Sequence, residues 1–414
     1  MRYKTAPFGE IPSHWQIKSI EEIAEVVTDY VANGSFASLK NNVQYLSEPD
    51  YAVLIRLVDF NKSFSGDFVY INKSSYDFLK KSQLFGGEII ISNVGANVGT
   101  VFKTPNLNMK MALAPNSVML RTKYCDDFYF HWLKSRYGQH MISAIISGSA
   151  QPKFNKTEFR KMLVPVPPIE EQREIANILN SYDKKIQLNK QINHHLEQIG
   201  QELFEQVYYN GSPAQLGDII NTLESGSRPK GGAEIGGIPS IGAENIERFG
   251  QYDYTKEKFI SLEYFKKLNR GVVHSGDVLL YKDGAYTGKV SMALDNFPHA
   301  QCAINEHVFI LRPSKRAPSS FFLYFLLLYD ENRQALFSRA SSKAAQPGLN
   351  QTEVKTLSIL LPTTEEIIKF DNTIAPIMHQ IAKNANENRK LSTLRDTLLP
   401  KLLSGEILVN QATK

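Results

Sequence analysis

The sequence contains very little cysteine: Cys125 and Cys302 are the only two among its 414 residues. They lie far apart in the chain, and neither has a second cysteine at the spacing of a zinc site. A disulfide framework and a cysteine-based metal site are therefore excluded. We expect both cysteines to be core residues of a protein from a reducing cytoplasm.

Long apolar segments are also missing. The longest, residues 321–329, is too short to cross a bilayer, and the first residues (MRYKTAPFGEIPSHW) lack the apolar segment of a signal peptide. The sequence therefore predicts a soluble cytoplasmic protein. Because 42% of its 414 residues are hydrophobic, the chain is long enough for two or three domains with cores of their own.

A large excess of either charge sign is absent as well. The net charge of +5 is common among soluble proteins of this size. Two segments described below as helices, residues 168–208 and 361–405, carry net charges of −3 and +1. The positive charge of the protein therefore lies outside these two segments.

No catalytic or cofactor motif is recognisable. The sequence has no Asn/Asp-Pro-Pro-Tyr/Phe tetrapeptide, no glycine-rich loop after a first strand and no nucleophile elbow. The segment GAYTGKV at residues 284–290 has three residues between its glycines and valine after its lysine, so it is not a Walker loop. His194 and His195 have no ligand partner at metal spacing, which favours a solvated helix face. We expect no catalytic residue, metal site or cofactor site in this chain.

One long unit occurs twice in the sequence. Residues 150–158 read AQPKFNKTE and residues 345–353 read AQPGLNQTE, so six of nine positions agree at a separation of 195 residues. The same register continues as far as Leu203 and Leu398. A duplicated unit predicts a fold with pseudo-two-fold symmetry, which suits a partner that is itself roughly two-fold, such as duplex DNA.

A long amphipathic helix is predicted after each copy of this motif. Apolar residues recur at steps of three, four and seven between Ile175 and Val207, and again between Phe370 and Leu402. A helix of about 40 residues would be a rod of roughly 60 Å. The simplest partner for each apolar stripe is the other stripe, so we expect an antiparallel, coiled-coil-like pair. Packing of each helix on its own globular domain is the alternative.

Four asparagines interrupt the two apolar stripes at equivalent positions: Asn189, Asn193, Asn384 and Asn388. Buried asparagines in a coiled coil fix the register of the helices at some cost in stability. Exposure to solvent is the alternative reading. Pro376 lacks a backbone N–H, which predicts a kink or break of the second helix near residues 372–376.

A globular region of about 150 residues lies ahead of each helix. Residues 87–91 (GEIII) and 276–280 (GDVLL) resemble each other as short buried strands, and a GAxxG turn follows each of them at the same offset of 189. Helical patterns follow at residues 127–146 and 319–338. Each region is therefore predicted to be mixed α and β, with long loops.

Three segments carry a resemblance to a known family. They are PVPPIEEQREIA at residues 165–176, the paired AQPxxNxTE segments, and LLPKLLSGE at residues 398–406. Together with the order of globular region, long helix, globular region and long helix, they resemble the specificity subunits of type I restriction-modification systems. The resemblance covers the whole chain. It is weaker at residues 362–368 (PTTEEII), where the second helix lacks the Gln-Arg pair of the first.

The resemblance implies an α+β fold with a pseudo-two-fold internal repeat. Residues 1–166 and 211–361 would be two target-recognition domains, each reading one DNA half-site. Residues 167–210 and 362–414 would contain the long helices that fix the gap between the half-sites. Because the two domains differ in sequence, the DNA site would be asymmetric.

The resemblance also implies partners and cofactors. The helices would recruit two methyltransferase subunits, followed by restriction/translocase subunits. S-adenosylmethionine, ATP and Mg²⁺ would bind to those partners, and the present chain would bind double-stranded DNA without catalysing a reaction. A helical scaffold that does not bind DNA is the alternative, and it would show no salt-sensitive binding to a duplex.

Polar residues near the glycine turns or ahead of strands are the candidates for DNA contact. In the first region they are Lys40, Arg56, Asn93, Asn97, Lys103 and Lys110. In the second region they are Arg228, Lys230, Lys282, Tyr286 and Lys289. The alternative is that these side chains contact no DNA, since lysine and arginine on a protein surface are usually just solvated.

Overall fold

The computed structural model describes residues 2–229, 231–342 and 348–407. The chain forms two compact units, of which unit 1 comprises Met1–Asp183 with Thr393–Lys414 and unit 2 comprises Lys184–Ser392. Each unit contains a β-rich body and a stretch of both long helices, α8 (Ile169–Tyr208) and α13 (Thr364–Leu403). The fold is α+β, as the sequence predicts.

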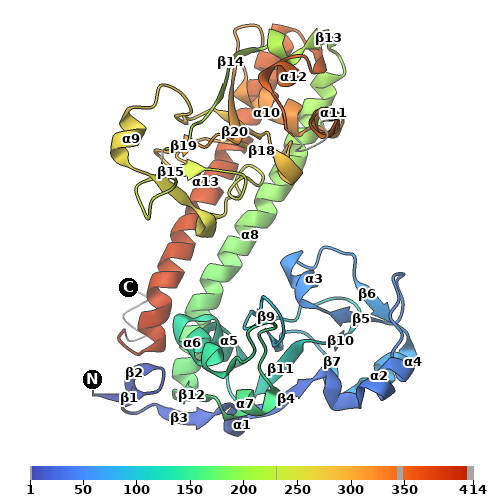
Figure 1. Cartoon of the computed structure of the whole chain (residues 1–414), viewed down its shortest axis with the longest axis vertical. Helices are drawn as coiled ribbons and strands as arrows, with labels where there is room; N and C mark the ends of the chain where they lie inside the picture. The colour runs from blue at the N-terminus through green and yellow to red at the C-terminus, as the bar shows by residue number, and fades with distance from the viewer. Residues whose placement is uncertain (1, 230, 343–347, 408–414) are drawn as a thin grey trace. The chain divides into compact units, whose positions relative to one another are not determined.

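Two four-stranded sheets form the body of unit 1 (Figure 1). The antiparallel sheet has the order β4 (Ala24–Asp29), β11 (Ser117–Thr122), β8 (Ile89–Ser92), β9 (Val101–Lys103). The second sheet has the order β6 (Val69–Ile71), β5 (Ala52–Ile55), β10 (Lys110–Leu113), β7 (Gln83–Leu84). The pair β5 and β10 is parallel, and every residue of β5 and β8 is buried, which explains their continuous apolar sequences.

Short strands and helices complete unit 1. The strands are β1 (Tyr3–Ala6) paired with β2 (Gly9–Pro12), and β3 (Gln16–Ser19) paired with β12 (Leu163–Val166). The helices are α1 (Ile20–Ile23), α2 (Phe36–Asn42), α3 (Leu57–Asn61), α4 (Lys73–Phe78), α5 (Asp126–Lys134), α6 (Arg136–Ile145) and α7 (Lys156–Lys161), with 3-10 turns η1 (Tyr30–Asn33) and η2 (Lys80–Ser82). Trp15 and Trp132 are fully buried in a core that also takes in Leu179 of α8 and Leu402 of α13.

Unit 2 repeats this topology. Its antiparallel sheet has the order β14 (Ile220–Ser225), β20 (Val308–Pro313), β17 (Val278–Tyr281), β18 (Val290–Met292), and its second sheet has the order β16 (Lys258–Ile260), β15 (Ile238–Ile241), β19 (Ala303–Ile304). The pair β15 and β19 is parallel, as β5 and β10 are in unit 1. The weak sequence likeness of the two globular regions therefore corresponds to one topology used twice.

The remaining elements of unit 2 also have counterparts. Strand β13 (Ser212–Gln215) pairs with β21 (Ser358–Leu361), and the helices are α9 (Leu262–Lys266), α10 (Ser320–Leu328), α11 (Asp330–Ser341) and α12 (Gln351–Lys355), with 3-10 turns η3 (Leu216–Asp218), η4 (Tyr254–Lys256) and η5 (Gly284–Tyr286). Helix α10 is buried along almost its whole length in a core that includes Phe204 of α8 and Phe370 of α13.

Each helical stretch expected within a globular region is in fact a pair of helices. Ser135 separates α5 from α6 with an extended backbone, and its hydroxyl oxygen accepts from the N–H of Gly138 as an N-cap. A side chain at Gly138 would meet the carbonyl of Trp132 at 2.3 Å, so the glycine permits the tight corner. Tyr329 separates α10 from α11, without a side-chain cap hydrogen bond.

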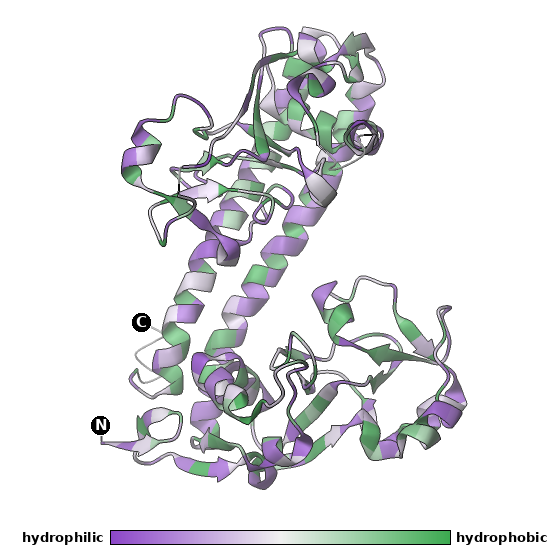
Figure 2. Cartoon of the chain, in the orientation of Figure 1, coloured by the Kyte–Doolittle hydropathy of each residue, from purple (hydrophilic) through white to green (hydrophobic). Residues whose placement is uncertain are grey.

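The two long helices are antiparallel partners within unit 2. Phe204, late in α8, lies against Phe370, early in α13, with 6.3 Å between ring centroids. Asn189, earlier in α8, donates to the side chain of Asn388, late in α13. Figure 2 shows hydrophobic and hydrophilic residues alternating along both helices, as two amphipathic stripes require.

The sequence predicts a kink or break near residues 372–376, but helix α13 is continuous through Pro376, so it has no break there. Proline removes one backbone hydrogen bond from a helix. The buried neighbours Ile374, Met378 and Ile381 hold this part of α13 against the core of unit 2. Tertiary packing therefore outweighs the local cost of the proline.

Cys302 is buried, and Cys125 is partly buried at the edge of the unit 1 core, so only the first is a full core residue. Both are free thiols. Among the described residues, no helix combines the length and apolar character needed to cross a bilayer.

The repeated AQPxxNxTE motif has the same structural role in both units, although residues 345–347 of the second copy lie outside the described part. Asn155 caps α7 by accepting from the N–H of Glu158, and Asn350 caps α12 by accepting from the N–H of Glu353. Directly before each cap, the N–H of Phe154 donates to the carbonyl of Asn93, and that of Leu349 donates to the carbonyl of Lys282. The motif therefore ties a helix start to the end of β8 or β17.

Replacing either cap asparagine by alanine is expected to destabilise the protein. Asn155→Ala and Asn350→Ala each remove an acceptor for a free helical N–H, so the free energy of unfolding should fall by about 1 kcal/mol. Urea unfolding of the full chain measures this. Asn155→Asp keeps the acceptor and should retain the stability. A loss of equal size in the aspartate variant would contradict the capping role.

Candidate nucleic-acid interface

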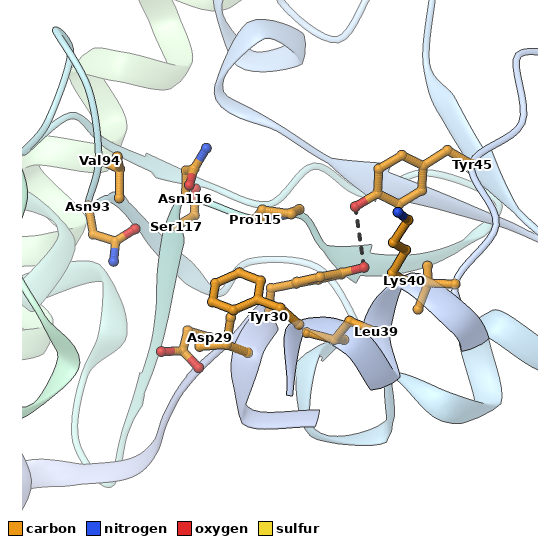
Figure 3. A pocket seen from close by; sticks show the side chains of 13 residues that line it. Asp29, Tyr30, Leu39, Lys40, Tyr45, Asn93, Val94, Pro115, Asn116 and Ser117 are labelled. Carbon is orange, nitrogen blue, oxygen red and sulfur yellow. Dashed lines mark hydrogen bonds between the residues drawn. The ribbon is translucent and has the colours of Figure 1, made fainter. Parts of the chain in front are cut away.

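A hollow of about 540 Å³ lies in unit 1 where β4 and β8 end and β11 begins. We call it the Asn93 hollow. Figure 3 shows Asn93 and Asn116 on one side, Lys40 and Tyr45 on the other, and Tyr30 between them. Its lining residues are Asp29, Tyr30, Val31, Phe36, Leu39, Lys40, Val43, Tyr45, Asn93, Val94, Pro115, Asn116 and Ser117.

Asn93 presents an unpaired acceptor at the wall of this hollow. Its side-chain Nδ2 donates to the carbonyl of Phe154 at 3.3 Å, which fixes the orientation of the amide. Its Oδ1 is buried and has no hydrogen-bond partner within the described part of the chain. A buried acceptor left unpaired costs about 1–3 kcal/mol. Such an atom therefore indicates a place where a donor can bind.

The rest of the hollow is largely apolar and aromatic. Phe36 is 83% exposed and Tyr45 is 52% exposed, whereas Tyr30 is buried and its hydroxyl accepts from that of Tyr45 at 3.2 Å. Burial raises the pKa of the Tyr30 hydroxyl well above its usual value, and the bond to Tyr45 adds to this. The tyrosine therefore stays neutral and can act as a hydrogen-bonding group.

A second hollow of about 410 Å³ adjoins the first across residues 115–117 and contains Arg56. Arg56 pairs through Nε and Nη2 with Asp59, which is fully buried, and Nη2 also donates to the carbonyl of Asp67. The bond to Asp59 raises the pKa of Arg56. Arg56 is thus held in place, with its guanidinium already bonded to this loop.

A basic hollow of about 580 Å³ lies along β4 and β11 of the same body. Its lysines and arginines are Lys80, Lys81, Arg121, Lys156 and Arg160, and Glu25 is its one acidic lining residue. Three of these cations are engaged: Arg121 pairs with Glu88, Lys156 with Asp29, and Arg160 donates to the carbonyl of Val27. Lys80 and Lys81 are exposed on η2, and no ion pair joins either of them to another described residue.

Phe85 adds an aromatic surface to the basic hollow. It is 68% exposed, and the guanidinium of Arg121 lies 5.8 Å from the centre of its ring. Burial alone would raise the pKa of Glu88. Hydrogen bonds from Thr104, from the N–H of Phe85 and from Arg121 have the larger combined effect, so the pKa of Glu88 is lowered. Arg121 is therefore held by a charged carboxylate beside an exposed ring, an arrangement suited to nucleic acid.

Of the six candidates in unit 1, the structure brings Lys40, Asn93 and Arg56 to the two adjoining hollows. Asn97 is exposed on the glycine turn after β8. Lys110 is exposed where β10 begins, at the end of that strand away from the hollows. Lys103 pairs with Asp127, and burial lowers its pKa, so it belongs to an internal network.

The candidates in unit 2 fall into two groups, and Lys230 lies outside the described residues. Arg228 and Lys282 belong to one chain of alternating basic and acidic side chains. In it, Arg228 pairs with Glu306, His307 contacts both Glu306 and Asp283, and Lys282 pairs with Asp283.

Tyr286 and Lys289 form the other group in unit 2. The ammonium of Lys289 lies 4.6 Å from the centre of the Tyr286 ring, which is on a side chain that is 55% exposed. Lys289 also pairs with Glu247 at 2.9 Å. The glycine turn after β17 thus presents an aromatic ring together with a cation.

The four helix asparagines form a polar layer between α8 and α13. Asn189 donates to Asn388 at 2.9 Å and to Glu387 at 2.8 Å, and Asn193 accepts from Asn384 at 2.8 Å. Asn189, Asn193 and Asn384 are buried, and Asn388 is partly buried. Solvent exposure is therefore not the reason why these residues interrupt the apolar stripes.

The basic hollow and the polar layer differ in how readily a sequence can reveal them. Asparagines at equivalent helix positions are visible as a pattern. The five cations of the basic hollow come from η2, β11 and α7, and only the folding of these segments against β4 unites them.

Among the residues that the structure describes, no three His, Cys, Asp or Glu side chains gather as a metal site would require.

Comparison with known proteins identifies the family. The family model described as the type I restriction modification DNA specificity domain matches residues 12–198 and again residues 213–395. The MjaIX specificity subunit of Methanocaldococcus jannaschii is 21% identical, covering 99% of this chain and 97% of the relative. The EcoKI specificity subunit of Escherichia coli is also 21% identical, covering 96% and 90%.

A solved structure has the same fold. The S subunit of the type I restriction-modification system from M. genitalium superposes with a TM-score of 0.58 at 16% identity, covering 96% of this chain and 99% of that one. The two family matches coincide with the two copies of the topology described above. The chain therefore belongs to the type I restriction-modification DNA specificity family, and it is the non-catalytic specificity subunit of such a system.

Proposed function

We propose that this chain reads a bipartite, asymmetric site on double-stranded DNA, with residues 1–166 reading one half-site and residues 211–361 the other. The helices within residues 167–210 and 362–414 fix the gap between the half-sites. Two methyltransferase subunits and then restriction/translocase subunits assemble on this chain in the cytoplasm. S-adenosylmethionine, ATP and Mg²⁺ bind to those partners.

The observation that carries this proposal is one topology with two different surfaces. The sheets of the two bodies share strand order and direction, so each body presents the same loops. The side chains on those loops differ, as at Asn93 and Lys282, which both follow the third strand of the antiparallel sheet. Two DNA-binding bodies with the same backbone and different side chains favour a DNA site whose two halves have different sequences.

The exposed side of α8 supports a protein partner on the helices. Leu188, Ile192 and Ile199 are 44–45% exposed on that helix, although most of its other apolar residues pack inward. Apolar side chains that remain in water along a helix are suited to packing against further helices. The methyltransferase subunits are the partners assigned to this surface.

The central test is a map of methylated adenines combined with domain exchange. The full chain, expressed with its own methyltransferase subunits in a bacterium without adenine methylation, should mark one bipartite asymmetric sequence. Replacing residues 213–350 by the corresponding region of another family member should change one half-site and preserve the other. A change in both halves would overturn the modular reading, and the absence of salt-sensitive DNA binding would favour a scaffold.

The polar layer is assigned the role of fixing helix register, and hence the DNA gap. Asn193→Leu leaves the amide of Asn384 without its partner, so the free energy of unfolding should fall by about 1–3 kcal/mol. Adding Asn384→Leu removes the orphaned group and should recover much of the loss. Urea unfolding measures both variants. The double variant should methylate sites of more than one gap length; a single unchanged gap would contradict the register role.

The basic hollow is assigned to the DNA backbone. Lys80→Gln with Lys81→Gln removes two cations, so affinity for any duplex should fall and the slope of log affinity against log salt should become shallower by about two. Fluorescence anisotropy with the full chain measures this across a salt series. Lys184→Gln with Lys190→Gln makes the same change in charge on exposed positions of α8 and should leave the slope unchanged. Equal effects in both pairs would indicate a general charge effect.

A further inference from the structure

Asn93 and Lys282 occupy the same position in the two bodies. Each is the residue directly after the buried strand, β8 or β17. The carbonyl of Asn93 accepts from the N–H of Phe154 at 3.1 Å, and the carbonyl of Lys282 accepts from the N–H of Leu349 at 2.8 Å. Phe154 and Leu349 are equivalent residues of the repeated motif, so the backbones match.

The backbone N–H groups of the two residues also match. Asn93 donates to the carbonyl of Asn116, which directly precedes β11, at 3.0 Å. Lys282 donates to the carbonyl of His307, which directly precedes β20, at 3.0 Å. Strands β11 and β20 hold the same place in their sheets. The shared backbone therefore holds two different side chains at one site.

These side chains differ in hydrogen-bonding capacity, because only Asn93 can accept a hydrogen bond. Asn93 offers an acceptor, because its Oδ1 is the unpaired atom at the Asn93 hollow, and its Nδ2 keeps one N–H besides the one bonded to Phe154. The ammonium of Lys282 offers only donors, and Asp283 engages it at 2.8 Å. An ammonium has three N–H bonds, so donors remain after that pair.

The bases of DNA differ in this same property. Adenine and cytosine present amino donors at their major-groove edges, and guanine presents two acceptors. We infer that this shared position determines specificity, with Asn93 accepting from the amino group of an adenine or cytosine in one half-site and Lys282 donating to a guanine in the other. The inference rests on the proposed function and adds to it which position in each body selects a base.

The surroundings of Asn93 strengthen a bond formed there. The Asn93 hollow has an apolar and aromatic lining, with Phe36 and Tyr45 exposed beside it. A hydrogen bond in such a site is stronger than one in water, and a base without a donor leaves the acceptor buried and unpaired. Discrimination therefore follows from the bond to the right base, which pairs an acceptor that a base without a donor leaves unpaired.

The experiment is selection of duplexes from a random-sequence library by the full chain and its variants. The wild-type chain should select two separated half-sites. Asn93→Leu should reduce the base preference at one position of one half-site roughly tenfold, and Lys282→Met should do the same in the other half-site. Asn93→Lys should shift the affected position towards guanine, while the second half-site and the gap stay unchanged.

Two controls separate base reading from structural support. Asn93→Asp keeps an acceptor and loses the bond to Phe154, so it should retain the preference for an amino group if Asn93 reads the base. Asn108→Lys adds the same charge as Asn93→Lys at an exposed position just before β10 and should leave the selected sequence unchanged. Thermal unfolding curves of all variants check that they are folded.

Several outcomes would overturn the inference. A wild-type chain that selects no bipartite site would refute the proposed function itself. If the wild type selects such a site and Asn93→Leu selects it with the same preference at every position, the inference fails while the proposed function stands. It also fails if Asn93→Leu leaves the selected sequence unchanged but abolishes recruitment of the methyltransferase subunits, because the hollow would then hold a protein side chain.

Discussion

Mutual burial of the apolar stripes of α8 and α13 is the constraint on which the rest of the molecule depends. Most of the stability of an amphipathic helix in a protein comes from packing of its apolar face, so each of these 40-residue helices needs the other or a body to cover that face. In unit 2, Phe204 and Phe370 lie in the same core as the body helix α10. In unit 1, Leu179 and Leu402 do the same beside Trp132. Each β-rich body is thus built onto the helix pair.

Because both bodies pack on the helix pair, some positions are more free than others to differ between the two copies. The helix caps at Asn155 and Asn350 and the hydrogen-bonded pair Asn193 and Asn384 belong to the frame, and the two copies agree at these positions. The loops after β8 and β17 keep their backbone bonds to the motif but carry different side chains. A body can therefore change its surface chemistry without losing its place on the helices.

The frame could be predicted from the sequence because its signals are periodic and local. Apolar spacing predicts both long helices, and the repeated motif predicts two related bodies. Local signals fail where tertiary packing decides the outcome. Pro376 suggests a break that the buried neighbours Ile374 and Met378 prevent, and the corner at Gly138 depends on close contact with Trp132.

The candidate site was less predictable for a related reason. Lys103 has the same local sequence signal as the other polar residues near the turn, yet it is paired with Asp127 and only partly exposed. Lys80 and Arg121 are far apart in sequence and line one hollow only because η2 packs on β4, the neighbour of β11. The unpaired Oδ1 of Asn93 depends on where the carbonyl of Phe154 lies, which no local pattern specifies.

The place of Leu402 and Leu403 in the core of unit 1 has a consequence for synthesis. These residues are 0% and 1% exposed, and they lie beside side chains such as Phe8 and Trp15 from the first residues made. The hydroxyl of Tyr3 also donates to the carbonyl of Gly405. The core of unit 1 therefore cannot be completed until Leu402 and Leu403 have been translated. A chain released before residue 402 would leave this core unfinished, although Phe8 and Trp15 would already have been made.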